Sequence, residues 1–111
     1  MVGRDAYIAV YMMADRPRRT IHIGVTSRFL TRIQEHREGQ VDGFTRRYGL
    51  KRLVWSEAHE PITTAIAREK SLKRWPRQWK INLIERENLR WDDLYSGLVD
   101  WVPPGGPLPA P

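Results

Sequence analysis

The stretch TIHIGVTSRFLTRIQEHREG constrains the fold more than any other, because within it the residue pattern of a strand gives way to that of a helix. β-Branched side chains dominate residues 20–25 and suit a pleated strand. Gly24 within that strand marks a position where a neighbouring backbone or a ligand comes close. Ser27 predicts a helix N-cap, and Gly39 predicts the residue just past the end of a helix that covers about residues 28–38.

One face of this helix is cationic. Arg28, Arg32 and His36 follow one another at intervals of four residues, so they project together along the helix. The preceding strand brings His22 to the same region. Guanidinium groups bind phosphate through charge-assisted, often bidentate hydrogen bonds. The spacing therefore predicts a compact site for a phosphate partner.

A second β-rich run, YIAVYMM at residues 7–13, precedes this strand, and the polar segment ADRPRR at residues 14–19 separates the two. Pro17 in that segment cannot continue a ladder of strand hydrogen bonds, so the two runs predict a β-hairpin with a loop of moderate length. Tyr11 and His22 lie near matching positions of the hairpin. Their side chains share a face only if the register aligns them, and the sequence alone does not set that register.

The second half of the chain predicts one strand and three helices. They cover, in order, residues 52–57, 61–75, 76–87 and 89–95. Pro61 lies where proline is favoured, in the first turn of its helix, and Pro76 interrupts the helical pattern and begins the next helix. We expect Trp79 to pack against the sheet and Trp91 to hold the closing helix against the body of the domain.

A carboxylate interrupts the apolar stripe of the first of these helices. The stripe consists of Ile62, Ala65, Ile66 and Leu72. Glu69 lies on the same stripe, and burying a carboxylate costs desolvation free energy unless it meets a cation, a donor or a metal ion. Glu69 therefore either forms a salt bridge, most simply to Lys73 one turn later, or belongs to a functional site.

Charge is the most informative property of the whole chain of 111 residues. The net charge is +6, but all 19 basic residues precede residue 91 and three of the 13 acidic residues follow it, so residues 1–90 carry +9. Such an excess is typical of nucleic-acid-binding proteins, although a basic surface that only aids solubility has the same composition. Arg46 and Arg47, together with Arg28, are the candidates for guiding a nucleic-acid strand.

The remaining composition sets limits on class and location. The chain has no cysteine, which excludes disulfides and restricts metal ligands to His, Asp and Glu. No apolar segment approaches the length of a signal peptide or a membrane span, so we expect a soluble, cytoplasmic protein without a membrane partner. We expect one domain at residues 1–96, followed at residues 97–111 by a flexible tail rich in proline and glycine.

Several motifs, taken in order, resemble the GIY-YIG nuclease superfamily, and especially its small single-domain bacterial members. They are Tyr11 in VYMM, HIGVTS at residues 22–27, Arg32 and His36 in RIQEH, and Glu69 in AIAREK. Further similar segments are GFTRRYG, RLVW, KRW and WDDLY. The resemblance implies an α+β fold of the order β-β-α-β-α-α, in which helices flank a small three-stranded antiparallel sheet.

The resemblance also implies a metal-dependent phosphodiesterase acting on nucleic acid, with DNA expected before RNA. Tyr11 matches a tyrosine that approaches the scissile phosphate, Arg32 an arginine that stabilises developing charge, and His36 a histidine found in some members. Glu69 matches the carboxylate that holds one Mg²⁺ or Mn²⁺. The chemistry agrees with these matches, because phosphoryl transfer needs a positioned water and cations at the phosphate oxygens.

The chain departs from the family pattern at one central position, where His22 replaces the tyrosine that usually precedes the Ile-Gly pair. An imidazole, with an ordinary pKa near 6.5, is a competent base at neutral pH, and an enzyme that uses it loses activity on acidification. The alternative is a weakened site in a domain that only binds nucleic acid. We favour retained activity, because the other matching residues are all present.

Overall fold

The computed structural model describes residues 7–39, 49–95 and 97, and its strands and helices follow the predicted order. The elements are β1 (Ala9–Ala14), β2 (Ile21–Thr26), α1 (Phe29–Arg37), β3 (Arg52–Ala58), α3 (Ile62–Arg74) and α4 (Arg77–Glu87). The fold is α+β with a three-stranded antiparallel sheet, as expected.

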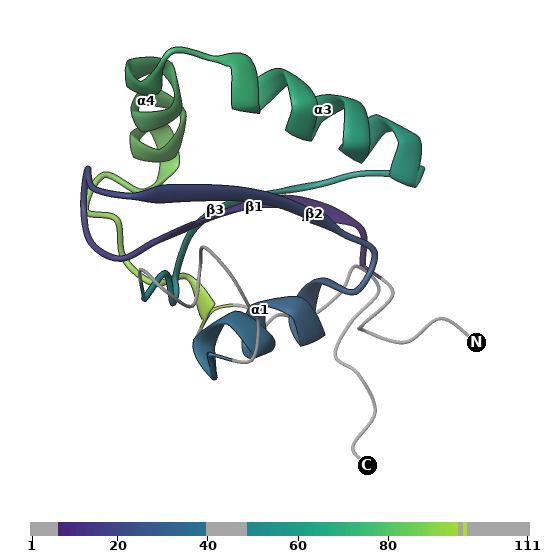
Figure 1. Cartoon of the computed structure of the whole chain (residues 1–111), viewed down its shortest axis with the longest axis horizontal. Coiled ribbons are helices and arrows are strands. Elements are labelled where there is room, and N and C mark those ends of the chain that lie inside the picture. Colours follow the sequence, from purple (N-terminus) through teal and green to yellow (C-terminus); the bar gives the residue numbers. More distant parts are fainter. Residues whose placement is uncertain (1–6, 40–48, 96, 98–111) are drawn as a thin grey trace.

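Strand β1 is the central strand of the sheet. It pairs antiparallel with β2 on one side and with β3 on the other, in the order β2-β1-β3. All of its residues are buried, because α3 and α4 lie on one face of the sheet and α1 lies on the other (Figure 1). A strand that is covered on both faces needs a continuous apolar run rather than an alternating one, and AVYMMA supplies it.

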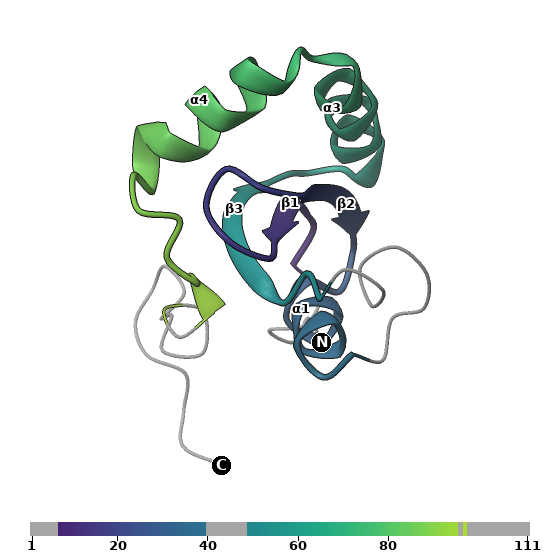
Figure 2. The ribbon, with the colours of Figure 1, turned by 60° about the vertical axis from the view of Figure 1, so that its left-hand side comes forward.

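The side chains of β1 alternate between two cores. Val10 and Met12 belong to the core beneath α3 and α4. Tyr11 and Met13 belong to the core beneath α1, which also contains Phe29. Among the described strands β2 lies at an edge of the sheet, and α1 and α3 lie on either side of this edge (Figure 2). Groups carried by both helices can therefore meet at the edge of β2.

Helix α1 begins one residue later than predicted. Arg28 rather than Ser27 is its N-cap, and no side chain among the described residues makes a capping hydrogen bond. Oγ1 of Thr26 accepts a hydrogen bond from the backbone N–H of Arg28. The end of the helix agrees with the prediction. Gly39 follows the C-cap with a φ of +71°, which glycine adopts at little cost, and its N–H donates to the carbonyl of His36.

The closing helix predicted over residues 89–95 is wrong over most of its length, because residues 89–94 are not helical and helical structure begins only at Tyr95. Asn88 holds the chain in another conformation: its side-chain amide donates to the carbonyls of Val54 and Asp92, and its Oδ1 accepts from the N–H of Asp92. Such side-chain hydrogen bonds offer the backbone an alternative to a helix. Trp91 is nevertheless buried, as expected.

Two apolar side chains that the spacing placed in the core are exposed. Trp79 on α4 is 56% exposed, and Ile66 on α3 is 38% exposed. Other apolar residues of the same helices, such as Leu72 and Ile84, are fully buried. The apolar stripes of both helices are thus wider than the face that a three-stranded sheet can cover.

No helix in the described part of the chain has the length and apolar character needed to cross a membrane. Arg46, Arg47 and residues 98–111 of the expected tail lie outside the described residues.

Candidate active site

Tyr11 projects from the central strand toward α1, opposite Gly24 of β2. A side chain cannot replace the glycine without a shift, because a Cβ atom on Gly24 would lie 2.4 Å from both Cζ and Oη of Tyr11. The sequence predicted that a backbone or a ligand comes close at Gly24, whereas the group that approaches is a side chain, this phenol ring. Tyr11 is buried and lies beside Phe29, with ring centroids 6.2 Å apart. The ring therefore has one tightly bounded position between β2 and α1.

His36 holds the phenol from the helix. Its Nε2 atom lies 2.9 Å from Oη of Tyr11 in a buried hydrogen bond, and the histidine is only 3% exposed. Its Nδ1 atom is buried and has no hydrogen-bond partner among the described atoms. Because a buried N–H without a partner is rarer than a buried acceptor without one, we assign the proton to Nε2, which donates to Oη. The hydroxyl proton of Tyr11 is then available to another acceptor.

His22 completes a cluster of three rings. It lies opposite Met13, two residues from Tyr11 along β1, so His22 and Tyr11 share the face toward α1. Ring centroids are 6.3 Å apart between Tyr11 and His22, 5.5 Å between Tyr11 and His36, and 5.7 Å between the two imidazoles. The register that the sequence left open is therefore one that brings the two strand residues together.

Burial governs the protonation of all three rings. It raises the pKa of Tyr11 to about 12 and, with nearby positive charge, lowers the pKa of His36 to about 4. Burial also lowers the pKa of His22, as does the charge of Lys73, while the charge of Glu69 opposes both. At neutral pH the cluster thus contains a neutral phenol and two neutral imidazoles.

Arg32 lies on α1 one turn before His36. Its side chain is 43% exposed and forms an ion pair with Glu35, with 3.6 Å between Nη1 and Oε1. Its charge lowers the pKa values of Tyr11 and His36, which places it within electrostatic reach of both. Arg28, a further turn away, is exposed. The predicted cationic face is therefore divided, because the histidine is buried with the rings and the two arginines remain at the surface.

Glu69 reaches the same edge from the other side of the sheet. Helix α3 packs on the face opposite α1 (Figure 1), yet the charge of Glu69 raises the pKa of both Tyr11 and His22. The Glu69 side chain is largely buried, and its Oε2 atom lies 3.3 Å from Nζ of Lys73. The salt bridge considered from the sequence is present, and the carboxylate also acts on the ring cluster.

The residues at this edge fit a hydrated divalent ion. Within residues 7–39 and 49–95, no three His, Asp or Glu side chains are grouped so that they could enclose a metal ion. Mg²⁺ does not need such a cage, because it is commonly held by one or two carboxylates, with water and substrate phosphate as its other ligands. Glu69 is a mostly buried carboxylate whose neighbouring rings are neutral, so it suits Mg²⁺ or Mn²⁺ held in this way.

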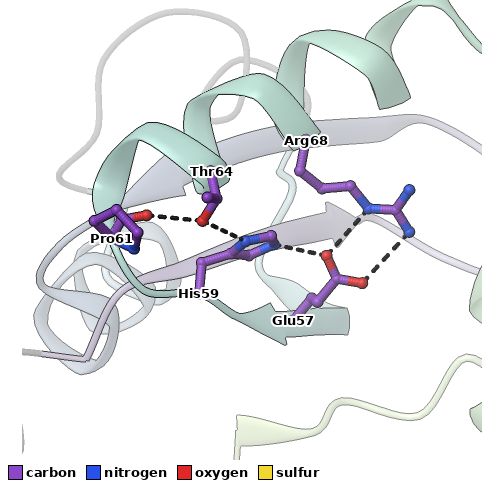
Figure 3. Close-up of polar contacts among 5 residues, drawn as sticks. All are labelled: Glu57, His59, Pro61, Thr64 and Arg68. Atoms are coloured by element: carbon purple, nitrogen blue, oxygen red, sulfur yellow. Dashed lines mark hydrogen bonds and ion pairs between the residues drawn. The ribbon is translucent and has the colours of Figure 1, made fainter.

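A second polar cluster attaches α3 to β3, the strand across β1 from β2 (Figure 3). Arg68 donates to both carboxylate oxygens of Glu57 on β3, and Nε2 of His59 lies 2.7 Å from one of them. Nδ1 of His59 lies 3.1 Å from Oγ1 of Thr64, whose hydroxyl donates to the carbonyl of Pro61 at 2.8 Å. The Thr64 hydroxyl donates its proton to that carbonyl and not to His59, so His59 does not act as a base toward it. We therefore assign the cluster a structural role, which is to fix the orientation of α3 and of Glu69.

Two features of the site were not predicted from the sequence. Lys73 was expected only as a partner of Glu69, yet its charge also lowers the pKa of His22. The burial of His36 was missed as well. A signal for it existed, since His36 lies seven residues after Phe29, or about two helical turns, and Phe29 faces the core.

A family model described as the GIY-YIG catalytic domain matches residues 7–82, which is more than half of the chain. The matched range includes the three rings, Arg32 and Glu69. Comparisons with curated proteins and with solved structures find no match. The family match covers every described strand and brings the ring cluster, the arginine and the carboxylate into one domain, and on this evidence the chain belongs to the GIY-YIG family.

Proposed function

We propose that the protein is a metal-dependent endonuclease that hydrolyses phosphodiester bonds in nucleic acid, with DNA favoured over RNA. Domains of the GIY-YIG family are usually nucleases. The observation that carries the proposal is that Glu69, on the helix that covers one face of the sheet, acts electrostatically on Tyr11 and His22, which share the other face. A carboxylate for a metal ion, a neutral imidazole and a phenol are groups that phosphodiester hydrolysis can use.

His22 is the residue to which we assign the base. Its lowered pKa keeps the imidazole neutral at physiological pH, so it can accept a proton from the attacking water. Tyr11 does not compete for this role, because its pKa of about 12 keeps the phenol protonated. With His36 donating to Oη, the hydroxyl of Tyr11 donates a hydrogen bond to a phosphate oxygen and orients it.

Arg32 supplies a cation to the phosphate. Its present partner is Glu35, and an ion pair between two side chains that are both more than a third exposed contributes only about 0–1 kcal/mol. A phosphate oxygen therefore replaces Glu35 at small cost. Glu69 would hold the metal ion, which when bound stabilises negative charge on the phosphate and makes water a stronger acid.

Glu69→Gln is the variant that tests this proposal, because it keeps the size of the side chain and removes its charge. Cleavage of labelled single-stranded, duplex and branched DNA, with RNA alongside, is measured in Mg²⁺, in Mn²⁺ and in EDTA. We expect wild-type cleavage to require metal and to fall by about a hundredfold or more in Glu69→Gln, while nucleic-acid binding is kept. Glu87→Gln, at an exposed position of α4, is the matched control and should cleave at the wild-type rate.

Two results would change the assignment. Cleavage that survives in Glu69→Gln would show that another group holds the metal. Binding without cleavage by the wild type, in every metal and on every substrate, would favour the second candidate, a non-catalytic nucleic-acid-binding module. The net charge of +6 is the observation that keeps this second candidate in consideration.

A further inference from the structure

A groove of about 340 Å³ lies beside the candidate site. Its walls come from the beginning of α1, the beginning of α3 and the end of β2, so it follows the edge of the sheet. Arg32 belongs to its lining, which makes the groove continuous with the place where we expect the phosphate. The volume is at the lower end of the range of small-molecule sites and suits one compact group.

The two walls of the groove differ in chemistry. The α1 wall carries Arg28, Arg32 and the hydroxyl-bearing Thr31. The α3 wall carries Ile62 and Ile66. One wall therefore attracts an anion, and the other offers apolar surface without a hydrogen-bonding side chain.

Ile66 is the unusual member of this lining. The sequence placed it in the core, but it is 38% exposed, and it lies one turn before Glu69 on α3. Covering a partly exposed isoleucine beside a polar site with an apolar group lowers the free energy of the complex. The occupant of the groove should therefore present an apolar face to Ile66.

The groove also has a balance of charge that favours an anion. Arg28 and Arg32 outnumber Glu35, which is the acidic member of the lining. Glu35 is paired with Arg32 across 3.6 Å in an exposed ion pair, which a stronger anion can displace. A group with a phosphate at one side and a flat apolar face at the other satisfies both walls.

We propose that this groove binds one unpaired nucleotide next to the scissile phosphate, with its phosphate toward the arginines of α1 and its base against Ile62 and Ile66. The inference rests on the proposed nuclease function and adds a class of substrate to it. In a duplex both faces of a base are covered by stacked neighbours, so only a single-stranded or branched substrate can place a base on the α3 wall.

The test compares binding of two short strands that differ only in their bases. One is a labelled oligothymidylate and the other is the same backbone with abasic residues, and binding is measured in EDTA so that no metal-dependent cleavage occurs. We expect the wild type to bind the thymidine strand about tenfold more tightly than the abasic strand. In Ile66→Ala the two strands should bind with nearly equal affinity, and Ile66→Leu should restore the difference.

Matched variants identify the source of the difference. Leu89→Ala removes an apolar side chain that is 74% exposed outside the groove, and it should keep the wild-type ratio between the two strands. Arg28→Gln should weaken both strands by the same factor, as loss of a phosphate contact does, and leave the ratio unchanged. A wild-type ratio near one, or an unchanged ratio in a folded Ile66→Ala variant, would overturn the proposal.

The binding assay separates this inference from the proposed function. A protein that cleaves nucleic acid but binds the thymidine and abasic strands equally would refute the proposed nucleotide site and leave the proposed nuclease function standing. Preference for base-bearing strands that depends on Ile66, in a protein that never cleaves, would refute the nuclease and place the nucleotide in a binding module. A duplex that competes with the thymidine strand as well as a single strand does would contradict the requirement for an unpaired base.

Discussion

The phenol ring of Tyr11 lies against Gly24, its partner across the first two strands, so closely that no side chain fits between them. Gly24 has no functional group, yet it determines where the hydroxyl of Tyr11 lies. The hydrogen bond between His36 and Oη restrains the same ring from α1. The glycine is therefore part of the site through the space that it leaves.

Gly24→Ala should displace the Tyr11 ring and weaken its hydrogen bond to His36. Overpacking of this kind typically lowers the free energy of unfolding by about 1–3 kcal/mol, and we expect cleavage to fall with it. Urea denaturation and a cleavage assay measure the two effects. In a Tyr11→Ala background the ring is absent, so Gly24→Ala should cost much less there. An equal cost in both backgrounds would show that the clash is not with Tyr11.

His22→Tyr introduces the residue that the family usually has at this position. The wild-type cleavage rate should rise with pH with a midpoint below the ordinary histidine pKa of about 6.5, because burial and the charge of Lys73 lower the pKa of His22. A phenol loses its proton near pH 10 in water, so the variant should need a higher pH for the same fraction of its maximal rate. Tyr11, His36, Glu69 and Lys73 surround the position in both proteins. An identical pH–rate profile would assign the base to another group.

Acid should destabilise the fold before the carboxylates titrate. The pKa of His36 is about 4 in the folded protein and near 6.5 in an unfolded chain, so the unfolded state binds the proton first as pH falls. The contribution of neutral His36 to the free energy of unfolding is fully present above pH 6.5 and is lost between pH 6.5 and about 4. It amounts to roughly 3 kcal/mol. Urea titrations across this range measure it. His36→Gln should flatten the dependence, leaving a smaller part from His22, and an unchanged slope would contradict the assignment.

Lys73→Met should lower the concentration of Mg²⁺ needed for half-maximal cleavage. The ammonium of Lys73 lies 3.3 Å from the Glu69 carboxylate and repels a cation that approaches it. An interaction of about 1 kcal/mol at such distances in a water-like medium corresponds to roughly a fivefold change in affinity. A Mg²⁺ titration of the cleavage rate measures the change. Lys70→Met, at an exposed position of the same helix, is the control that should leave the titration unchanged. A higher Mg²⁺ requirement in Lys73→Met would indicate that the lysine assists binding.

The local part of the fold could be predicted from the sequence. The hairpin, α1 and the end of α1 at Gly39 follow from β-branched runs, helical spacing and the left-handed preference of glycine. Glu69 could also be identified, because a carboxylate on an apolar stripe is conspicuous in a single sequence. These features depend on residues close together in the chain, which is why the pattern was sufficient.

Features that depend on tertiary contacts could not be predicted. The register between β1 and β2 decides whether Tyr11 and His22 share a face, and a shift by one residue would separate them. Ile66 was assigned to the core because helical spacing identifies an apolar face without showing how much of it the sheet covers. The spacing after α4 predicts a helix over residues 89–95, but the side chain of Asn88 satisfies the backbone groups of a different conformation.

The strand order β2-β1-β3 has a consequence for how the site is assembled during folding. The hairpin and α1 are contiguous in the chain, and together they contribute all three rings and Arg32. The Glu69 carboxylate joins these groups only after β3 has paired with β1 and α3 has packed on the sheet. Pairing between parts of the chain that are distant in sequence is slower than pairing between neighbouring segments. A nascent or partly folded chain can therefore present the groups that attract phosphate while it still lacks Glu69. Under the proposed function, cleavage of nucleic acid is then expected of the completely folded molecule alone.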